Sequence, residues 1–187
     1  MKQIVLWVML LFVLLPSAWA VDVEGVKVRD KVEVEGQTLQ LNGAGVRTKF
    51  FFDIYVGALY LAHPSSQAEA VLAKPNPVRV SMDILYSAVD KEKLAKGWNS
   101  GFKKNQSEAS FAVLKNRLDA FNAMFSDARK GDHLYFDFIT NGETRVVIKG
   151  QEVGSIKGLD FQQALLAVWL GNKPADNDLK QAMLKGK

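Results

Sequence analysis

Arg47 is the side chain whose sequence neighbours most clearly suggest a chemical role. It follows the glycine-containing segment Gly43-Ala-Gly-Val. The next segment, Phe50 to Leu61, is mostly apolar but contains Tyr55 and Tyr60. Glycine tolerates backbone conformations that other residues resist, so the pattern predicts a loop that presents Arg47 at the mouth of a strand pair. A guanidinium in apolar surroundings needs an anionic partner, and its two parallel donors match a carboxylate.

Two kinds of partner fit this arginine. One is a carboxylate of the protein itself at the surface, since most arginine side chains stay exposed. The other is an anionic ligand in an apolar pocket. If a reaction took place there, a general acid or base would have to lie within hydrogen-bond reach of the substrate. The spacing suggests three candidates for that role, Tyr55, Tyr60 and Asp90.

The composition excludes several other kinds of chemistry. The 187 residues include no cysteine, which rules out disulfides, thiolate catalysis and a cysteine-based zinc site. Two histidines, His63 and His133, are too few for a histidine-rich metal site. No phosphate loop, Gly-x-Ser-x-Gly elbow or His-Glu-x-x-His motif occurs, so we expect neither a metal nor a cofactor. The formal net charge of +4 is small and does not indicate a nucleic-acid partner.

The first twenty residues predict a signal peptide for export. Lys2 supplies the positive start, Ile4 to Leu15 is an unbroken apolar run, and Ala18-Trp-Ala20 is a small-x-small cleavage site. A helix over that run would rise about 18 Å, too little for a hydrocarbon core of about 30 Å. We expect cleavage after Ala20 and a periplasmic protein with no membrane span after cleavage. An uncleaved membrane anchor is the alternative.

Residues 21–187 are predicted to form one α+β domain. Period-two alternation, and at 50–61 a high content of Phe, Tyr, Ile and Val, predicts strands at 26–28, 31–34, 37–41, 50–61, 78–85, 132–140, 143–149 and 151–156. Helical patterns occur at 67–74, 90–104, 107–125, 160–170 and 175–184. Turns are predicted at Gly36, Asn42-Gly43 and Asn141-Gly142. This order of elements favours an antiparallel sheet of six or seven strands with helices grouped on one side.

Three of the predicted helices carry specific signals. The helix at 107–125 has apolar residues spaced three, four, three and four, which predicts one core-facing stripe: Phe111, Leu114, Leu118, Phe121 and Phe125. The helix at 90–104 is rich in lysine, with Asp90 and Glu92 interleaved, and is interpreted as a solvated face. Asp160 and Gln163 predict a capping box at the start of the helix at 160–170.

Several segments together carry a family resemblance. They are Gly43-Ala-Gly-Val-Arg47, Val56-Gly-Ala-Leu-Tyr-Leu61, Lys91-Glu-Lys-Leu94, Phe121 to Phe125, Gly131, and Phe161 to Gly171. In these segments the chain resembles the chalcone isomerase family, and in particular its bacterial, exported branch. The resemblance covers most of residues 21–187. It implies an open-faced β-sandwich, in which a large antiparallel sheet is covered by a layer of helices, with a cleft between the two.

The resemblance also implies positions for a site. In the plant enzymes of the family an Arg, a Thr, a Tyr, an Asn and a late Thr or Ser line the cleft. They cyclise a chalcone into a flavanone by attack of a phenolate on an enone. The Arg corresponds to Arg47. The other four positions fall on Tyr55, Asp90, Gly97 and Val168, so most of that polar set is not retained.

Three functions stay open on this evidence. Non-catalytic members of the family bind fatty acids through the Arg and a nearby Tyr. That resemblance implies a binder of a fatty acid or similar apolar carboxylate, with Arg47, Tyr55 and Tyr60 as ligand-binding residues and Asp90 as a further polar contributor. The second function is an intramolecular lyase or isomerase in which Arg47 stabilises an oxyanion. The third is an interaction or scaffold domain, whose cleft would be filled by its own side chains.

Overall fold

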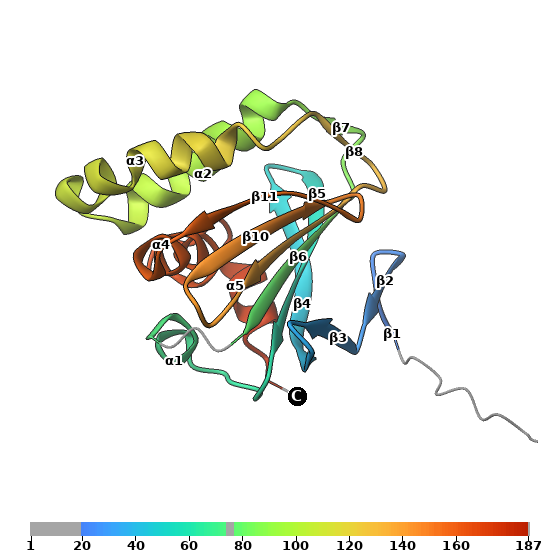
Figure 1. Ribbon diagram of the computed structural model, residues 1–187. Coiled ribbons are helices and arrows are strands. Elements are labelled where there is room, and N and C mark those ends of the chain that lie inside the picture. The colour runs from blue at the N-terminus through green and yellow to red at the C-terminus, as the bar shows by residue number, and fades with distance from the viewer. Residues whose placement is uncertain (1–19, 74–76, 187) are drawn as a thin grey trace, which may run out of the picture.

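A seven-stranded antiparallel sheet forms the centre of the computed structural model, which describes residues 20–73 and 77–186 (Figure 1). The strand order is β11-β10-β9-β6-β5-β4-β3. The strands are β3 (Lys31–Val34), β4 (Gln37–Lys49), β5 (Phe52–Leu61), β6 (Val78–Ile84), β9 (His133–Phe138), β10 (Glu143–Ile148) and β11 (Gln151–Lys157). Two short pairs flank the sheet, β1 (Ala20–Val23) with β2 (Val26–Arg29) and β7 (Ala88–Val89) with β8 (Ala128–Arg129). The predicted antiparallel sheet is confirmed.

Five helices are present in the described part of the chain. They are α1 (Ala68–Ala73), α2 (Lys91–Asn105), α3 (Glu108–Asn122), α4 (Leu159–Leu170) and α5 (Asn177–Met183). The predicted apolar stripe of α3 faces the core, because Leu114, Leu118 and Phe121 are fully buried. In Figure 1, α2 and α3 lie together over the sheet. None of these helices is long and apolar enough to cross a bilayer.

The alternation of side chains along β5 divides the core between the two faces of the sheet. Tyr55 and Leu59 point toward the helices and join the larger apolar cluster. Val56 and Tyr60 point the other way, into a smaller cluster that Val28 of β2 helps to close. Tyr55 and Tyr60 are five positions apart, an odd number, so a regular strand places their side chains on opposite faces.

The glycines before Arg47 lie inside β4, so the predicted loop and the predicted turn at Asn42-Gly43 are wrong. Their backbone is extended, and their role is to admit α5. A Cβ atom at Gly43 would lie 2.1 Å from the carbonyl oxygen of Ala182, and one at Gly45 would lie 2.5 Å from the Ala182 Cβ. Both distances are too short, so α5 can pack on β4 because these residues have no side chain.

Asn42 fixes the same contact by hydrogen bonds. Its buried amide donates to the carbonyl oxygens of Ser65 at 2.9 Å and Met183 at 2.8 Å. Its side-chain oxygen accepts from the Ser65 backbone N–H at 2.7 Å. The end of α5 and the segment after β5 are therefore both tied to the middle of β4.

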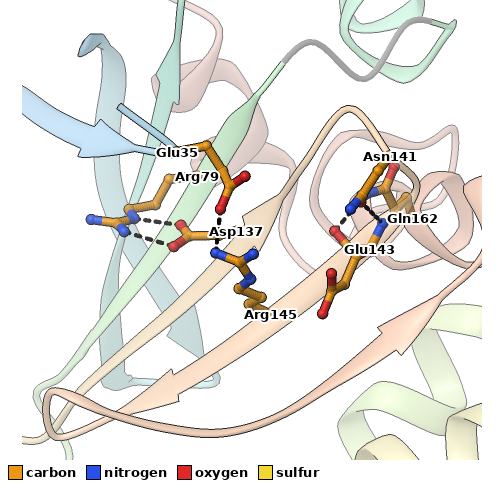
Figure 2. Close-up of polar contacts among 7 residues, drawn as sticks. All are labelled: Glu35, Arg79, Asp137, Asn141, Glu143, Arg145 and Gln162. Atoms are coloured by element: carbon orange, nitrogen blue, oxygen red, sulfur yellow. Dashed lines mark hydrogen bonds and ion pairs between the residues drawn. The ribbon is translucent and has the colours of Figure 1, made fainter. Parts of the chain in front are cut away.

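Two ion pairs lie on the sheet face opposite the helices (Figure 2). Arg79 on β6 donates to Asp137 on β9 through two parallel hydrogen bonds, at 2.5 and 2.7 Å. Arg145 on β10 reaches Glu35 in the β3–β4 turn. These pairs satisfy polar groups on strands whose other face packs in the helix-side core.

The start of α4 differs from the predicted capping box. The residue before the helix is Gly158, and no side chain caps it. Asp160 instead pairs with Arg117 of α3 at 2.5 Å. Gln162 is buried and donates to the backbone oxygens of Ile139 at 3.0 Å and Glu143 at 2.8 Å, which anchors α4 to the β9–β10 turn (Figure 2).

Candidate functional site

A cavity of about 590 Å³ lies between the sheet and helix α2. Strands β4, β5 and β6 supply its base, and α2 forms its other wall. Much of the lining is apolar, including Ile54, Met82, Ile84, Val89, Leu94, Trp98 and Val168. Its volume falls within the range of about 300–1,000 Å³ that small-molecule sites occupy. The cleft is therefore not filled by the protein's own side chains.

Arg47 lines this cavity without a partner of its own. It is opposite Tyr55 in the β4–β5 ladder, and the central guanidinium carbon lies 5.7 Å from the centre of the Tyr55 ring. Its Nε atom is buried and has no hydrogen-bond partner among the described residues. Arg47 takes part in none of the ion pairs found among those residues. The alternative of a surface carboxylate partner therefore finds no support in this geometry.

Tyr55 lines the cavity, and its hydroxyl is fixed by a hydrogen bond within the core. The hydroxyl oxygen accepts a hydrogen bond from Nε1 of Trp169 on α4 at 3.0 Å, within the core. Burial raises the pKa of the Tyr55 phenol, and the nearby Arg47 cation opposes that rise only in part. The phenol is therefore neutral near neutral pH and keeps its proton, so that it can act as a hydrogen-bond donor.

Trp98 adds a second unpaired donor to the lining. It lies on α2 and borders the cavity, and its ring packs against Phe121, Phe125, Phe136 and Trp169. Its indole N–H is buried and lacks a partner within the described chain. Buried donors are normally satisfied, so the unpaired Arg47 Nε favours an acceptor supplied from outside the protein chain.

The cavity is strongly basic where it is polar. Besides Arg47 its lining includes Lys49, Lys93, Lys96, Lys104 and Lys173, and no Asp or Glu of the described residues lines it. Lys93 has its own counter-ion, because its Nζ lies 2.9 Å from Asp90. The lysines of α2 are exposed, as predicted for a solvated helix face. Three of them also line the cavity. The excess positive charge favours an anionic ligand.

The sequence-predicted residues divide between the cavity and other places. Arg47 and Tyr55 both line the cavity. Gly97 and Val168, at positions where the plant enzymes have polar residues, line it as well. Tyr60 belongs to the cluster on the opposite sheet face, where burial raises the pKa of its phenol to about 12. Tyr60 is therefore not placed to touch a ligand in this cavity. Asp90 precedes α2 and lies outside the lining.

Two features of the site were not anticipated from the sequence. Trp169 positions the Tyr55 hydroxyl, although the two residues are 114 positions apart. Trp98 lines the cavity from α2. The sequence offered one signal for both features: a tryptophan occurs in each of two predicted helices, and a buried indole N–H usually needs a hydrogen-bond acceptor nearby.

Comparison with known proteins assigns the family. The sequence model of the family described as chalcone isomerase-like matches residues 20–185, and the chain belongs to that family. The fold resembles the crystal structure of a fatty-acid binding protein from Arabidopsis thaliana, with a TM-score of 0.63 and 13% sequence identity. That match covers 83% of this chain and 96% of the plant protein. No curated protein sequence shows significant similarity to this chain.

Proposed function

We propose that this protein is a non-catalytic binder of a fatty acid or a similar apolar carboxylate. The observation that carries the proposal is the buried, unpaired Nε of Arg47 beside an open, largely apolar cavity. A carboxylate can accept two parallel hydrogen bonds from a guanidinium and a third from the Tyr55 hydroxyl. The alkyl tail would lie against the apolar lining, where each buried CH₂ contributes about 0.8 kcal/mol.

The electrostatics of the cavity support the same class of ligand. Five lysines accompany Arg47 in the lining, so the local potential attracts an anion before contact is made. Arg47, whose Nε atom is buried, and the buried Tyr55, however, lie beside each other on neighbouring strands. We therefore assign them the carboxylate, and assign the exposed lysines to attraction and to the cavity mouth. The likeness in fold to a fatty-acid binding protein is consistent with this assignment.

The proposal favours binding over a lyase or isomerase activity. At the positions that match the plant enzymes' Tyr and Asn, the chain has Asp90, outside the cavity, and Gly97, without a side chain. Val168 replaces the late hydroxyl. An oxyanion donor can be worth about 10²–10³ in rate, so a site without these donors would lose most of its advantage.

We further propose that the protein is exported and acts in the periplasm. The support is the sequence of residues 1–20, of which 1–19 lie outside the described residues. The predicted cleavage site precedes Val21, and the family match begins at residue 20. N-terminal sequencing of the protein recovered from the periplasm should begin at Val21. A sequence beginning at Met1 would contradict cleavage.

The binding proposal is tested by calorimetric titration of delipidated protein with laurate and with methyl laurate. Hydrogen bonds to charged groups contribute about 1.5–3 kcal/mol each. Arg47→Ala should therefore weaken laurate binding by about tenfold to a few hundredfold. Arg47→Lys should restore only part of that loss, because an ammonium cannot form the two-pronged contact. Tyr55→Phe should cost less than Arg47→Ala, since it removes one neutral donor.

The matched control for these variants is Arg29→Ala. Arg29 is an exposed arginine on β2 and does not line the cavity, so its loss should leave laurate affinity unchanged. The ester should bind wild type more weakly than the acid. Equal affinity for acid and ester, or unchanged affinity in Arg47→Ala, would refute the carboxylate site and favour the interaction-domain alternative.

A further inference from the structure

Three consecutive phenylalanines are exposed at the turn between β4 and β5, at the upper end of the cyan strands in Figure 1. Phe50 is 83% exposed, Phe51 95% and Phe52 55%. We refer to Phe50–Phe52 as the aromatic tip. Six large apolar side chains are exposed in the described part of the chain, and the other three, Val113, Val153 and Leu159, are not consecutive in the sequence. Single exposed apolar residues are ordinary, whereas a contiguous apolar patch marks a contact surface.

The fold itself does not account for the aromatic tip. Lys49 pairs with Phe52, so Phe50 and Phe51 form a two-residue hairpin turn. Phe50 has a φ angle of 58°, a conformation that favours Gly, Asn or Asp in such turns and is unusual for a bulky residue. Phe51 is almost fully solvated and so gains little from packing. Phe50 thus costs folding energy and Phe51 contributes almost none, so neither phenylalanine is explained by the stability of the fold.

The aromatic tip adjoins the mouth of the cavity. The Phe52 ring packs edge-on against Tyr86, with ring centres 5.5 Å apart, and Tyr86 lines the cavity. Lys49 also lines the cavity, and its Nζ lies 6.0 Å from the centre of the Phe50 ring. Lys93, Lys96 and Lys104 border the same cavity from α2.

The charges near the aromatic tip are predominantly positive. Three carboxylates lie around this end of the cavity: Asp53 accepts from the Thr48 hydroxyl at 2.9 Å, Asp176 accepts from the Thr48 backbone N–H at 3.2 Å, and Asp90 pairs with Lys93. Arg47 and the five lysines of the cavity lining outnumber them. The other lysines of the mouth have no such partner among the ion pairs of the described residues. Aromatic rings flanked by lysines suit the surface of an anionic bilayer, where the rings can reach the acyl chains and the lysines can contact the phosphates of the headgroups.

We infer that the aromatic tip inserts into the headgroup region of an anionic lipid bilayer, so that the cavity mouth faces the membrane. The lysines would contact lipid phosphates while Phe50 and Phe51 enter the acyl boundary. This inference goes beyond the proposed function, since it concerns the membrane surface and not the occupant of the cavity. A bilayer-facing mouth would allow an apolar ligand to pass between lipid and cavity without crossing water.

A position-specific test uses Phe51→Trp in the full chain, with Val113→Trp as the matched control. Val113 is 70% exposed on α3, away from the cavity. Each variant is mixed with vesicles of phosphatidylcholine and phosphatidylglycerol that carry bromine on their acyl chains, and the wild-type spectrum is subtracted. We expect bromine to quench the tryptophan at 51 and not the one at 113. Attachment through another segment would not favour position 51, so equal quenching or none at all would overturn the inference.

A second measurement gives the strength of the contact. In flotation with the same vesicles without bromine, the exported form of Phe50→Ser/Phe51→Ser should partition at least about tenfold more weakly than wild type, and Val113→Ser should match wild type. Wild-type partition should fall in pure phosphatidylcholine and at high salt. Unchanged partition in the double variant would overturn the inference. A second outcome would also overturn it: wild type does not bind vesicles but self-associates, and the double variant does not self-associate. That outcome would assign the aromatic tip to contact with a second copy of the chain. No fatty acid is added, so either result is independent of the laurate titration.

Discussion

Gly97 offers a way to close the cavity without disturbing the fold. It lies on α2 and lines the cavity, and a Cβ atom added there would meet nothing within 4 Å. The backbone at Gly97 is helical, and its φ is not in the left-handed region. Gly97→Phe should therefore be accepted by the helix, and helix propensity alone favours the change by a few tenths of a kcal/mol. The new ring should occupy space that a ligand would otherwise fill.

The expected effect on affinity follows from the displaced methylene groups. The phenylalanine side chain adds seven carbon atoms to a cavity of about 590 Å³. If it displaces about four CH₂ groups of a bound alkyl chain, the loss is about 3 kcal/mol at about 0.8 kcal/mol each. That loss corresponds to roughly a hundredfold weaker binding. The carboxylate end should still engage Arg47, so shorter fatty acids should lose less affinity than longer ones.

The assay is calorimetric titration with a series of saturated fatty acids, together with urea unfolding. Gly97→Ala is the first control, because it adds one carbon and should increase stability by about 0.5–1 kcal/mol with affinity preserved. Lys103→Phe is the second, because it places the same ring on α2 at an exposed position outside the cavity lining. If Gly97→Phe is folded and binds laurate as wild type does, the ligand does not occupy this cavity and the reasoning fails.

Two further predictions concern the framework around the site. Asn42→Ala leaves a buried backbone oxygen of Met183 and partly buried backbone groups of Ser65 without partners, so it should lower the free energy of unfolding by about 1–3 kcal/mol in urea titration. Thr38→Ala removes an exposed hydrogen bond and should stay within about 0.5 kcal/mol of wild type. Burial raises the pKa of Tyr60 from 10.0 to about 12, so the unfolded chain loses this proton first as the pH rises. Stability should therefore fall by about 2–3 kcal/mol between pH 10 and 12, and Tyr60→Phe should flatten that fall. An unaltered slope in Tyr60→Phe would contradict the assignment.

Periodicity predicted the elements well, because it reports which side of each element is buried. Helix α2 begins one residue after the predicted start, and β6 ends one residue before the predicted end. The apolar stripe of α3 identified its buried face directly. The family resemblance then placed Arg47 and Tyr55 in one site, which spacing alone had left open.

The sequence misled where a residue type has two physical uses. Glycine permits tight turns, and it also permits close approach of another element. At Gly43 and Gly45 the second use applies, and its partner α5 lies far along the chain. No local pattern reveals such a partner. Tyr60 is a different case, because its odd separation from Tyr55 already indicates the opposite face of a regular strand.

At the positions where the plant enzymes have polar cleft residues, this chain has residues that suit binding of a ligand better than catalysis of its reaction. A fixed cation and a neutral phenol can hold a carboxylate, but a phenol whose pKa is raised by burial is a poor base near neutral pH. At Gly97 and Val168 the donors that would orient a polar aromatic substrate give way to open space and an apolar wall. Each change lowers the cost of burying methylene groups and raises the cost of burying hydroxyl groups. The cavity thus combines Arg47, Tyr55 and a rim of lysines with a wall that is otherwise largely apolar, which fits the proposed ligand with one anionic end and a saturated tail.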